Sequence, residues 1–323
     1  MNNDLSSYFE DPEFKEALEK YEGMVKNHTP AYFDADELTD IAEYYASKGR
    51  QIEAEAAIDF ALQLHPNDTD ALIFRARSLA MKGRLDEAYM VMDLIEDRSD
   101  REVRFLKADL LMEEKRMEEA DHVFEELAAY EEGKLETLID IILAYIDANQ
   151  EALAKKWIKH VGETYDLASL SQKNQKFRDL LCDFYITFNN PEAAIPLLQA
   201  TLDCYPYSIN HWNSLGKCYL STNDYEEAHE AIDFALAIDD SNAEALTLKA
   251  FCYQQSGELQ KSCDYYLRLA EQQENKTRAY LALAKTYFEM QDYTSSIYYI
   301  EALLDNKDAL SKYELSELYG DIA

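Results

Sequence analysis

The stretch that decides the fold runs from Trp212 to Ala235 and reads WNSLGKCYLSTNDYEEAHEAIDFA. Its first half places apolar or small residues at the helical spacing i, i+3, i+4 and i+7, namely Trp212, Leu215, Gly216 and Tyr219. Asn223 follows, a residue type that tolerates the left-handed backbone at the end of a helix. The second half has a helical stripe of its own, made of Ala228, Ile232 and Ala235. The stretch therefore predicts two helices joined by a tight turn.

The same pattern recurs along the chain at a period close to 34 residues, which is the sign of a repeat protein. The small residue of the second helix has eight copies, at Ala54, Ala88, Ala120, Ala154, Ala194, Ala228, Ser262 and Ser296. A small residue of the first helix has seven, at Ala42, Ala76, Ala108, Cys182, Gly216, Ala250 and Ala284, with Ile142 in the fourth repeat. Six turns hold glycine or asparagine, at Gly49, Gly83, Asn149, Asn189, Asn223 and Gly257. Eight helix-turn-helix repeats are predicted.

The order Trp-x-x-Leu-Gly-x-x-Tyr, followed by Ala228 and Ala235, resembles the tetratricopeptide repeat. In that family, small residues at the eighth and twentieth places let the two helices of a repeat approach closely. The resemblance implies an all-α, right-handed α-solenoid (superhelix) with terminal capping helices. It also implies a concave groove, lined by the first helix of each repeat, that binds proteins or peptides.

Two irregular spacings and two flanking segments set the expected domain boundaries. The spacing falls to 32 residues between Ala88 and Ala120 and rises to 40 between Ala154 and Ala194. We expect a capping helix and loop at 1–34, repeats one to four at 35–161, an irregular insertion or candidate hinge at 162–174, repeats five to eight at 175–308, and a capping helix or the start of a further repeat at 309–323. The flanking helices are expected from apolar residues at near-helical spacing: Phe14, Leu18, Tyr21 and Val25 at the first end, and Leu310, Tyr313, Leu315 and Leu318 at the second.

Charge and composition exclude several classes of function. The 31 lysines and arginines face 64 aspartates and glutamates, so the formal net charge is −33. A surface this acidic repels nucleic acid and anionic membranes. With 47% hydrophobic residues the chain is nevertheless expected to fold, because a disordered acidic chain lacks the apolar residues to form a core.

No pattern indicates catalysis, a cofactor or a metal site. The histidines have no metal-ligand spacing, and no glycine-rich phosphate loop or nucleophile motif occurs. The five cysteines are odd in number and have no CxxC spacing, so we expect reduced thiols in a cytoplasmic protein. No run of about 18 apolar residues and no secretory leader is seen. We therefore expect an acidic, non-enzymatic scaffold or adaptor.

Two sets of residues fall at the places that the resemblance assigns to the groove. The apolar set lies in repeats two to four and consists of Ile73, Phe105, Met112, Ile139, Leu143 and Ile146. It indicates either a channel for an amphipathic segment or residues that pack on one another. The basic and aromatic set lies in repeats six to eight and consists of Asn213, Lys217, Phe251, Arg278, Lys285 and Phe288. It suits an acidic segment or a C-terminal carboxylate, unless the lysines pair with nearby carboxylates of the chain.

Three cations stand at the seventh place of the first helix, where the family prefers leucine: Arg75, Lys107 and Lys249. We expect their stems to pack while their charges reach Asp or Glu on a neighbouring helix. The favoured function is capture of a protein or peptide segment in the groove. The alternative is a regulatory subunit or sensor whose superhelical pitch changes on binding, hinged at the insertion after Val161. Self-association through an aromatic surface is a weaker expectation.

Overall fold

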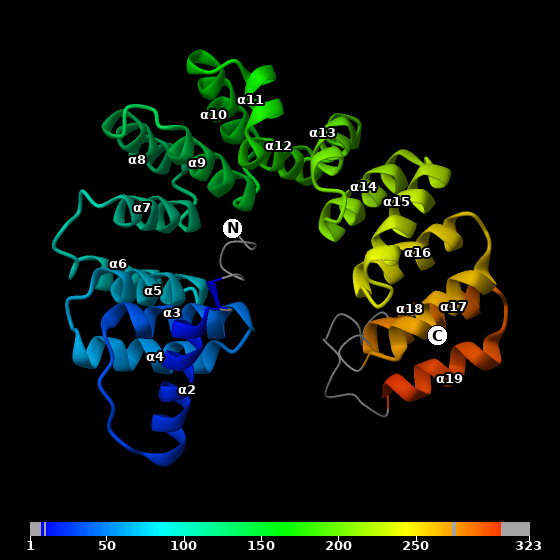
Figure 1. Cartoon of the computed structure of the whole chain (residues 1–323), viewed down its shortest axis with the longest axis horizontal. Helices are drawn as coiled ribbons and strands as arrows, with labels where there is room; N and C mark the ends of the chain where they lie inside the picture. Colours follow the sequence, from blue (N-terminus) through cyan, green and yellow to red (C-terminus); the bar gives the residue numbers. More distant parts are fainter. Residues whose placement is uncertain (1–7, 10, 273–275, 305–323) are drawn as a thin grey trace. The chain divides into compact units, whose positions relative to one another are not determined.

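The computed structural model describes residues 8–9, 11–272 and 276–304, and these ranges contain 18 helices and no strand. The all-α prediction is therefore confirmed for the part of the chain that is described (Figure 1). A chain with only 8 glycines and 6 prolines has few residues that interrupt helices. Across the described residues, each helix is too short or too polar to span a bilayer.

The chain divides into two compact units, residues 1–144 and 145–323, and the division falls inside one helix. The N-terminal unit holds α2 (Pro12–Asn27), α3 (Ala35–Ser47), α4 (Gln51–Leu64), α5 (Thr69–Met81), α6 (Leu85–Met92), α7 (Arg101–Glu113), α8 (Met117–Tyr130) and most of α9 (Leu135–Asp147). The C-terminal unit holds the end of α9, α10 (Glu151–Thr164), α11 (Leu167–Lys173), α12 (Gln175–Thr187), α13 (Pro191–Cys204), α14 (Ile209–Thr222), α15 (Tyr225–Ile238), α16 (Ala243–Gln255), α17 (Leu259–Ala270), α18 (Lys276–Glu289) and α19 (Tyr293–Leu304).

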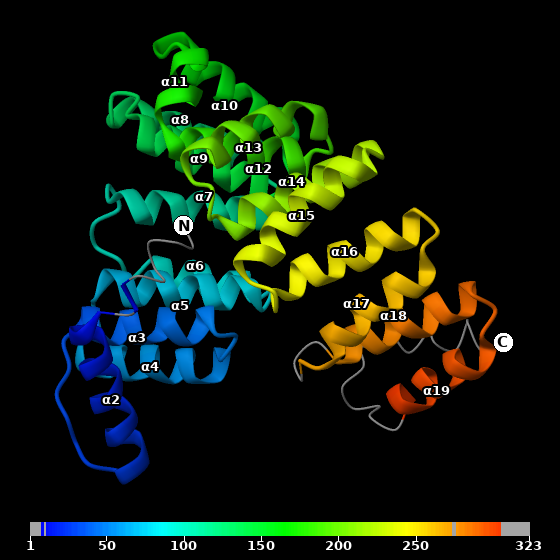
Figure 2. The same ribbon diagram turned by 45° about the vertical axis from the view of Figure 1, so that its right-hand side comes forward.

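Consecutive helices pair as the repeat pattern predicts. In the N-terminal unit, α3 packs on α4, α5 on α6 and α7 on α8, which form repeats 1 to 3. In the C-terminal unit, α12 packs on α13, α14 on α15, α16 on α17 and α18 on α19, which form repeats 5 to 8 (Figures 1 and 2). Repeat 4 is the pair α9 and α10, and the division between the units runs through its first helix.

Each of the eight repeats turns at a residue with a left-handed backbone. The six glycines and asparagines that the sequence singled out all have positive φ, between 54° for Asn189 and 80° for Gly257. In the other two repeats the same place is held by Lys115 and Gln291, with φ of 62° and 61°. These two side chains adopt the strained conformation because the flanking helices hold the turn.

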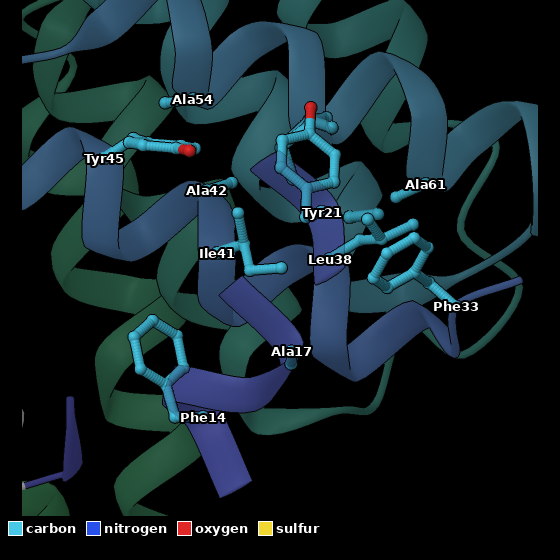
Figure 3. Close-up of a cluster of buried hydrophobic side chains, with 13 residues drawn as sticks. Phe14, Ala17, Tyr21, Phe33, Leu38, Ile41, Ala42, Tyr45, Ala54 and Ala61 are labelled. Atoms are coloured by element: carbon cyan, nitrogen blue, oxygen red, sulfur yellow. The ribbon is translucent and has the colours of Figure 1, made fainter. Parts of the chain in front are cut away.

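The N-terminal helix α2 covers the first repeat, as expected. It begins at Pro12 after Asp11, whose carboxylate accepts a hydrogen bond from the backbone N–H of Glu13 at 2.8 Å. The side chains that α2 buries against α3 and α4 are Phe14, Ala17 and Tyr21 (Figure 3). Val25 was expected on this face but is 53% exposed, so that prediction was wrong. It lies near the end of α2, in the last turn before the left-handed His28.

The irregular insertion expected at 162–174 is in fact mostly helical. Helix α10 continues to Thr164, and Asp166 then caps the short helix α11 by accepting a hydrogen bond from the backbone N–H of Ala168 at 3.2 Å. The units divide before this segment, between Ala144 and Tyr145, so the hinge at 162–174 stays a prediction. The C-terminal cap expected at 309–323 lies outside the described residues.

Candidate functional site

The first predicted pair of site residues, Asn213 and Lys217, lies on α14 and is bound to the next repeat. The Nδ2 group of Asn213 donates to Oδ1 of Asn242 at 3.1 Å and to Oε2 of Glu244 at 3.0 Å. Glu244 also forms an ion pair with the ammonium of Lys217. Asn213 itself is buried, with 1% of its surface exposed. The alternative that this lysine pairs with a carboxylate of the chain is therefore what the structure shows, and its charge is already balanced.

The second predicted pair, Lys285 and Phe288, lies on α18 and lines a pocket between α18 and α19. The pocket has a volume of about 180 Å³ and is lined by Leu281, Ala284, Lys285, Phe288, Glu289, Ser296 and Ile300. The hydroxyl of Ser296 donates to the carbonyl of Ala284 at 2.9 Å, which ties α19 to α18. Because a cavity of about 150 Å³ holds a benzene ring, this pocket has room for one large apolar side chain.

The aromatic rim of this pocket is open to solvent. Phe288 is 54% exposed and lies edge-on to Tyr293, with 5.5 Å between ring centroids. The two remaining members of the predicted set, Phe251 on α16 and Arg278 on α18, are also exposed. They do not line the pocket. From the set of six, Lys285 and Phe288 thus meet at the pocket, and Asn213 and Lys217 meet at Glu244.

The apolar set does not form an open channel. Ile73, Phe105, Ile139 and Ile146 are buried, with exposed fractions of 4% to 7%. Phe105 shows why: its ring packs on Phe124 with 5.2 Å between centroids, and the guanidinium of Arg101 lies 5.0 Å from its centroid. Met112 and Leu143 are partly buried. The burial of the first four side chains favours the packing alternative over a channel.

Two of the three seventh-place cations behave as expected. Arg75 forms an ion pair with Asp59, and the ammonium of Lys249 lies 2.6 Å from Oδ1 of Asp233. Both carboxylates belong to the second helix of the preceding repeat. Lys249 is 2% exposed, and its ammonium also donates to the backbone carbonyl of His229 at 3.3 Å. Lys107, in contrast, is exposed.

Sequence reasoning missed an acidic face on the first helices of the N-terminal unit. Arg77 on α5 lies 3.6 Å from a carboxylate oxygen of Glu102 and 3.5 Å from one of Asp109, both on α7. Glu43 and Asp70 add charge to the same region, and desolvation together with like charges raises the pKa of each carboxyl. The sequence pattern could have revealed this face, because its charged residues occupy the second and ninth places of the first helix in repeats 1, 2 and 3.

We predict that Asp109→Asn stabilises the protein at neutral pH and has no effect in acid. Desolvation raises the pKa of Asp109 to about 6, from an ordinary value of 3.8. The contribution of Asp109 to folding stability is therefore greatest below pH 3.8, where the carboxyl is protonated in both the folded and the unfolded chain. It is lost as the pH rises through 6, because the folded protein must then hold the carboxylate in a desolvated place. Because the side chain is 37% exposed and solvent screens it, we expect a gain of only about 1 kcal/mol at pH 7. Urea unfolding at pH 4 and pH 7 measures it, and a pH-independent difference contradicts it.

Comparison with known proteins agrees with the repeat architecture. Residues 39–89 and 213–277 match the family model described as tetratricopeptide repeat. Over 191 residues the chain is 26% identical to the formate-dependent nitrite reductase complex subunit NrfG of Escherichia coli O157:H7, covering 57% of this chain and 89% of that protein.

Solved structures of helical-repeat proteins are also similar. A tetratricopeptide repeat protein from Parabacteroides merdae aligns at a TM-score of 0.49 and 16% identity, over 78% of this chain and 98% of that one. MamA aligns at a TM-score of 0.44 and 18% identity, over 52% and 95%.

The two stretches that match the family model fall on the described helix pairs, from α3 to α6 and from α14 into α18. Small residues and left-handed turn residues stand there at the places of the repeat pattern, with Ser262 in place of alanine in repeat 7. The chain therefore contains tetratricopeptide repeats over the matched residues, and these repeats support a scaffold of the protein-interaction kind.

Proposed function

We propose that this scaffold captures an extended or helical peptide segment by inserting one large apolar side chain into the pocket between α18 and α19. The observation that carries the proposal is the pocket itself, about 180 Å³ and walled by Leu281, Phe288 and Ile300. Lys285 and Phe288 stand at the ninth and twelfth places of the first helix of repeat 8, which the family resemblance assigns to the groove.

The charge at the rim suggests which residues flank the inserted side chain. Lys285 and Glu289 both line the pocket and are one turn apart on α18. An ammonium beside an apolar pocket favours a carboxylate next to the inserted side chain, either an acidic residue or the end of a chain. We place the predicted acidic segment or C-terminal carboxylate at Lys285, because this lysine lines the pocket.

The test uses peptides selected on the wild-type chain from a random phage-displayed library and then synthesised with a fluorescent label. We expect Phe288→Ala to weaken their binding by about tenfold or more, because aromatic anchors contribute most to such contacts. Phe234→Ala is the matched control, since Phe234 on α15 is also 54% exposed but lies outside the pocket. Equal binding of the peptides to Phe288→Ala and Phe234→Ala contradicts the proposal. Comparing free-acid with amidated peptides on Lys285→Gln tests the carboxylate preference.

A further inference from the structure

Repeat 6 exposes an aromatic patch on α14, on α15 and on the loop before them. The rings of Trp212 on α14 and Phe234 on α15 stack with 4.5 Å between centroids and 19° between planes. Phe234 is 54% exposed, Ile238 lies one turn further along α15 and is 36% exposed, and Tyr207 in the loop is 82% exposed. We call Tyr207, Trp212, Phe234 and Ile238 the Trp212 patch. Large apolar side chains grouped in this way mark a binding surface.

The rings of the Trp212 patch are held in place. The indole Nε1 of Trp212 donates to the carbonyl of Pro206 at 2.8 Å, which fixes the loop next to Tyr207. One face of the Phe234 ring rests on Trp212, so the exposed part of this side chain includes the opposite face. A ring that is already fixed loses little freedom when a ligand binds to it.

The first repeat shows what an aromatic pair at these places accepts. Counting back 174 residues, Tyr207 and Phe234 correspond to Phe33, in the link between α2 and α3, and to Phe60 on α4. The rings of Phe33 and Phe60 lie 6.2 Å apart, and the ammonium of Lys20 on α2 lies 4.2 Å from the centroid of Phe33. Phe33 is fully buried. In repeat 1 the chain itself therefore places a cation on this aromatic pair, whereas in repeat 6 the rings are exposed.

The charge around the Trp212 patch also favours a cation. Residues 179–248 contain one lysine, Lys217, against twelve aspartates and glutamates, and Lys217 forms an ion pair with Glu244. Glu230 is exposed on α15, one turn before Phe234. A guanidinium on the open face of Phe234 therefore lies next to a carboxylate on the same face of the helix.

We propose that the Trp212 patch binds an extended, basic segment of a partner protein, with an arginine on Phe234 and an apolar side chain on Ile238. The planar guanidinium stacks on aromatic rings and pairs with carboxylates, here that of Glu230. The spacing suits an extended chain. Residues four apart on a helix are separated by about 6 Å along its axis, and alternate residues of an extended segment by about 6.6 Å. The patch lies outside the pocket between α18 and α19, so this inference does not depend on the proposed function.

The fluorescence of Trp212 reports binding at the patch directly. In the full-length chain with Trp157→Phe, Trp212 is the sole tryptophan. The probe is the peptide acetyl-Arg-Ala-Leu-Ala-Arg-amide, which has an arginine two residues from the leucine in either chain direction. We expect a saturable change in fluorescence at low ionic strength, and an affinity about fivefold lower when citrulline, which is uncharged, replaces both arginines. The absence of a saturable change, or equal affinities of the two peptides, overturns the proposal.

Variants of the patch separate stacking from general attraction to an acidic protein. Phe234→Ala and Glu230→Gln are each expected to weaken binding of the arginine peptide about fivefold, with the fold checked by circular dichroism. Asp264→Asn is the matched control, because Asp264 is exposed at the same place of repeat 7, where Arg268 replaces the phenylalanine. Equal losses in Glu230→Gln and Asp264→Asn show attraction by the net charge alone and overturn the proposal.

A second control separates the patch from the pocket. Phe288→Ala is expected to leave the affinity for the arginine peptide unchanged, because Phe288 lines the pocket and not the patch. A loss in Phe288→Ala without a loss in Phe234→Ala assigns the peptide to the pocket and contradicts a site at Trp212. The proposed function is tested by other peptides, so either idea can fail while the other stands.

Discussion

Gly216→Leu is expected to lower the free energy of unfolding by about 3 kcal/mol, near the upper end of the range for overpacking a filled core. Gly216 lies inside α14, where α14 packs on α15. A Cβ atom at this position would lie 2.8 Å from Cγ1 of Ile232 and 3.9 Å from the carbonyl oxygen of Ala228. Ile232 is fully buried, so it has no free space into which to move.

Two effects oppose each other at this glycine, and their sizes decide the outcome. Glycine inside a helix costs about 0.5–1 kcal/mol relative to alanine, because it loses more backbone freedom when the helix forms. Leucine at this position therefore raises the helix propensity. The contact with Ile232 is shorter than packed carbon atoms tolerate, because their optimal separation is about 3.5–4.0 Å. A leucine adds three further carbons beyond that clash. The steric cost therefore exceeds the gain in helix propensity.

Gly23→Leu provides the matched control. Gly23 lies inside α2, and a Cβ atom there meets nothing within 4 Å. The same substitution is therefore expected to stabilise α2 by about 0.5–1 kcal/mol. Urea unfolding followed by the fluorescence of Trp212, in a Trp157→Phe background, measures the first variant, and circular dichroism measures the second. If both variants lose stability equally, close packing at position 216 is not the cause.

The sequence predicts the repeats well because their spacing depends on local rules. A left-handed turn residue, a small residue where two helices touch and an apolar stripe are each set by neighbours within one hairpin. Gly216 and Asn223 satisfy these rules, and the structure gives both residues the expected roles. Lys115 and Gln291 escaped notice as turn residues because neither type favours positive φ on its own.

The candidate site was predicted less well, because exposure at the groove places depends on packing between repeats. Phe105 and Phe288 both stand at places assigned to the groove, but Phe105 is 7% exposed and Phe288 is 54% exposed. The ring of Phe105 is covered by Arg101 and packs on Phe124. Helical periodicity gives the side on which a residue lies. It does not give the distance to the next repeat or the salt bridge that a lysine such as Lys217 finds there.

Arg178→Met is expected to release α11 and to cost about 3 kcal/mol locally, because several hydrogen bonds from one buried charge are lost together. Arg178 is 4% exposed on α12. Its Nε donates to the hydroxyl of Thr201 at 2.7 Å, and its Nη1 donates to the carbonyls of Ser171 and Gln172, each at 3.2 Å. It therefore ties the last turn of α11 to α12 and α13.

Helix α11 depends strongly on this tether, because it has seven residues and none of them is buried. A helix this short is not stable on its own in water. Besides the arginine, a close apolar approach holds it: the Leu167 side chain lies 3.1 Å from where a Cβ atom on Gly162 would stand. Methionine at position 178 fills much of the volume of the arginine stem but donates no hydrogen bond, so the two carbonyls at the end of α11 lose their partner.

Hydrogen exchange measured peptide by peptide tests this prediction. In Arg178→Met we expect residues 166–174 to lose their protection while α13 stays protected, and Arg178→Lys to fall between, since one ammonium cannot reproduce the fork of the guanidinium. Lys176→Met is the control, because Lys176 is a cation of the same helix that is exposed. Unchanged protection of α11 in Arg178→Met contradicts the tether. A loss confined to α11 identifies Arg178 as the residue that fixes the segment 162–174, which is the predicted hinge. A ligand that changes the superhelical pitch at this segment must then also break the bonds of Arg178 to Ser171 and Gln172.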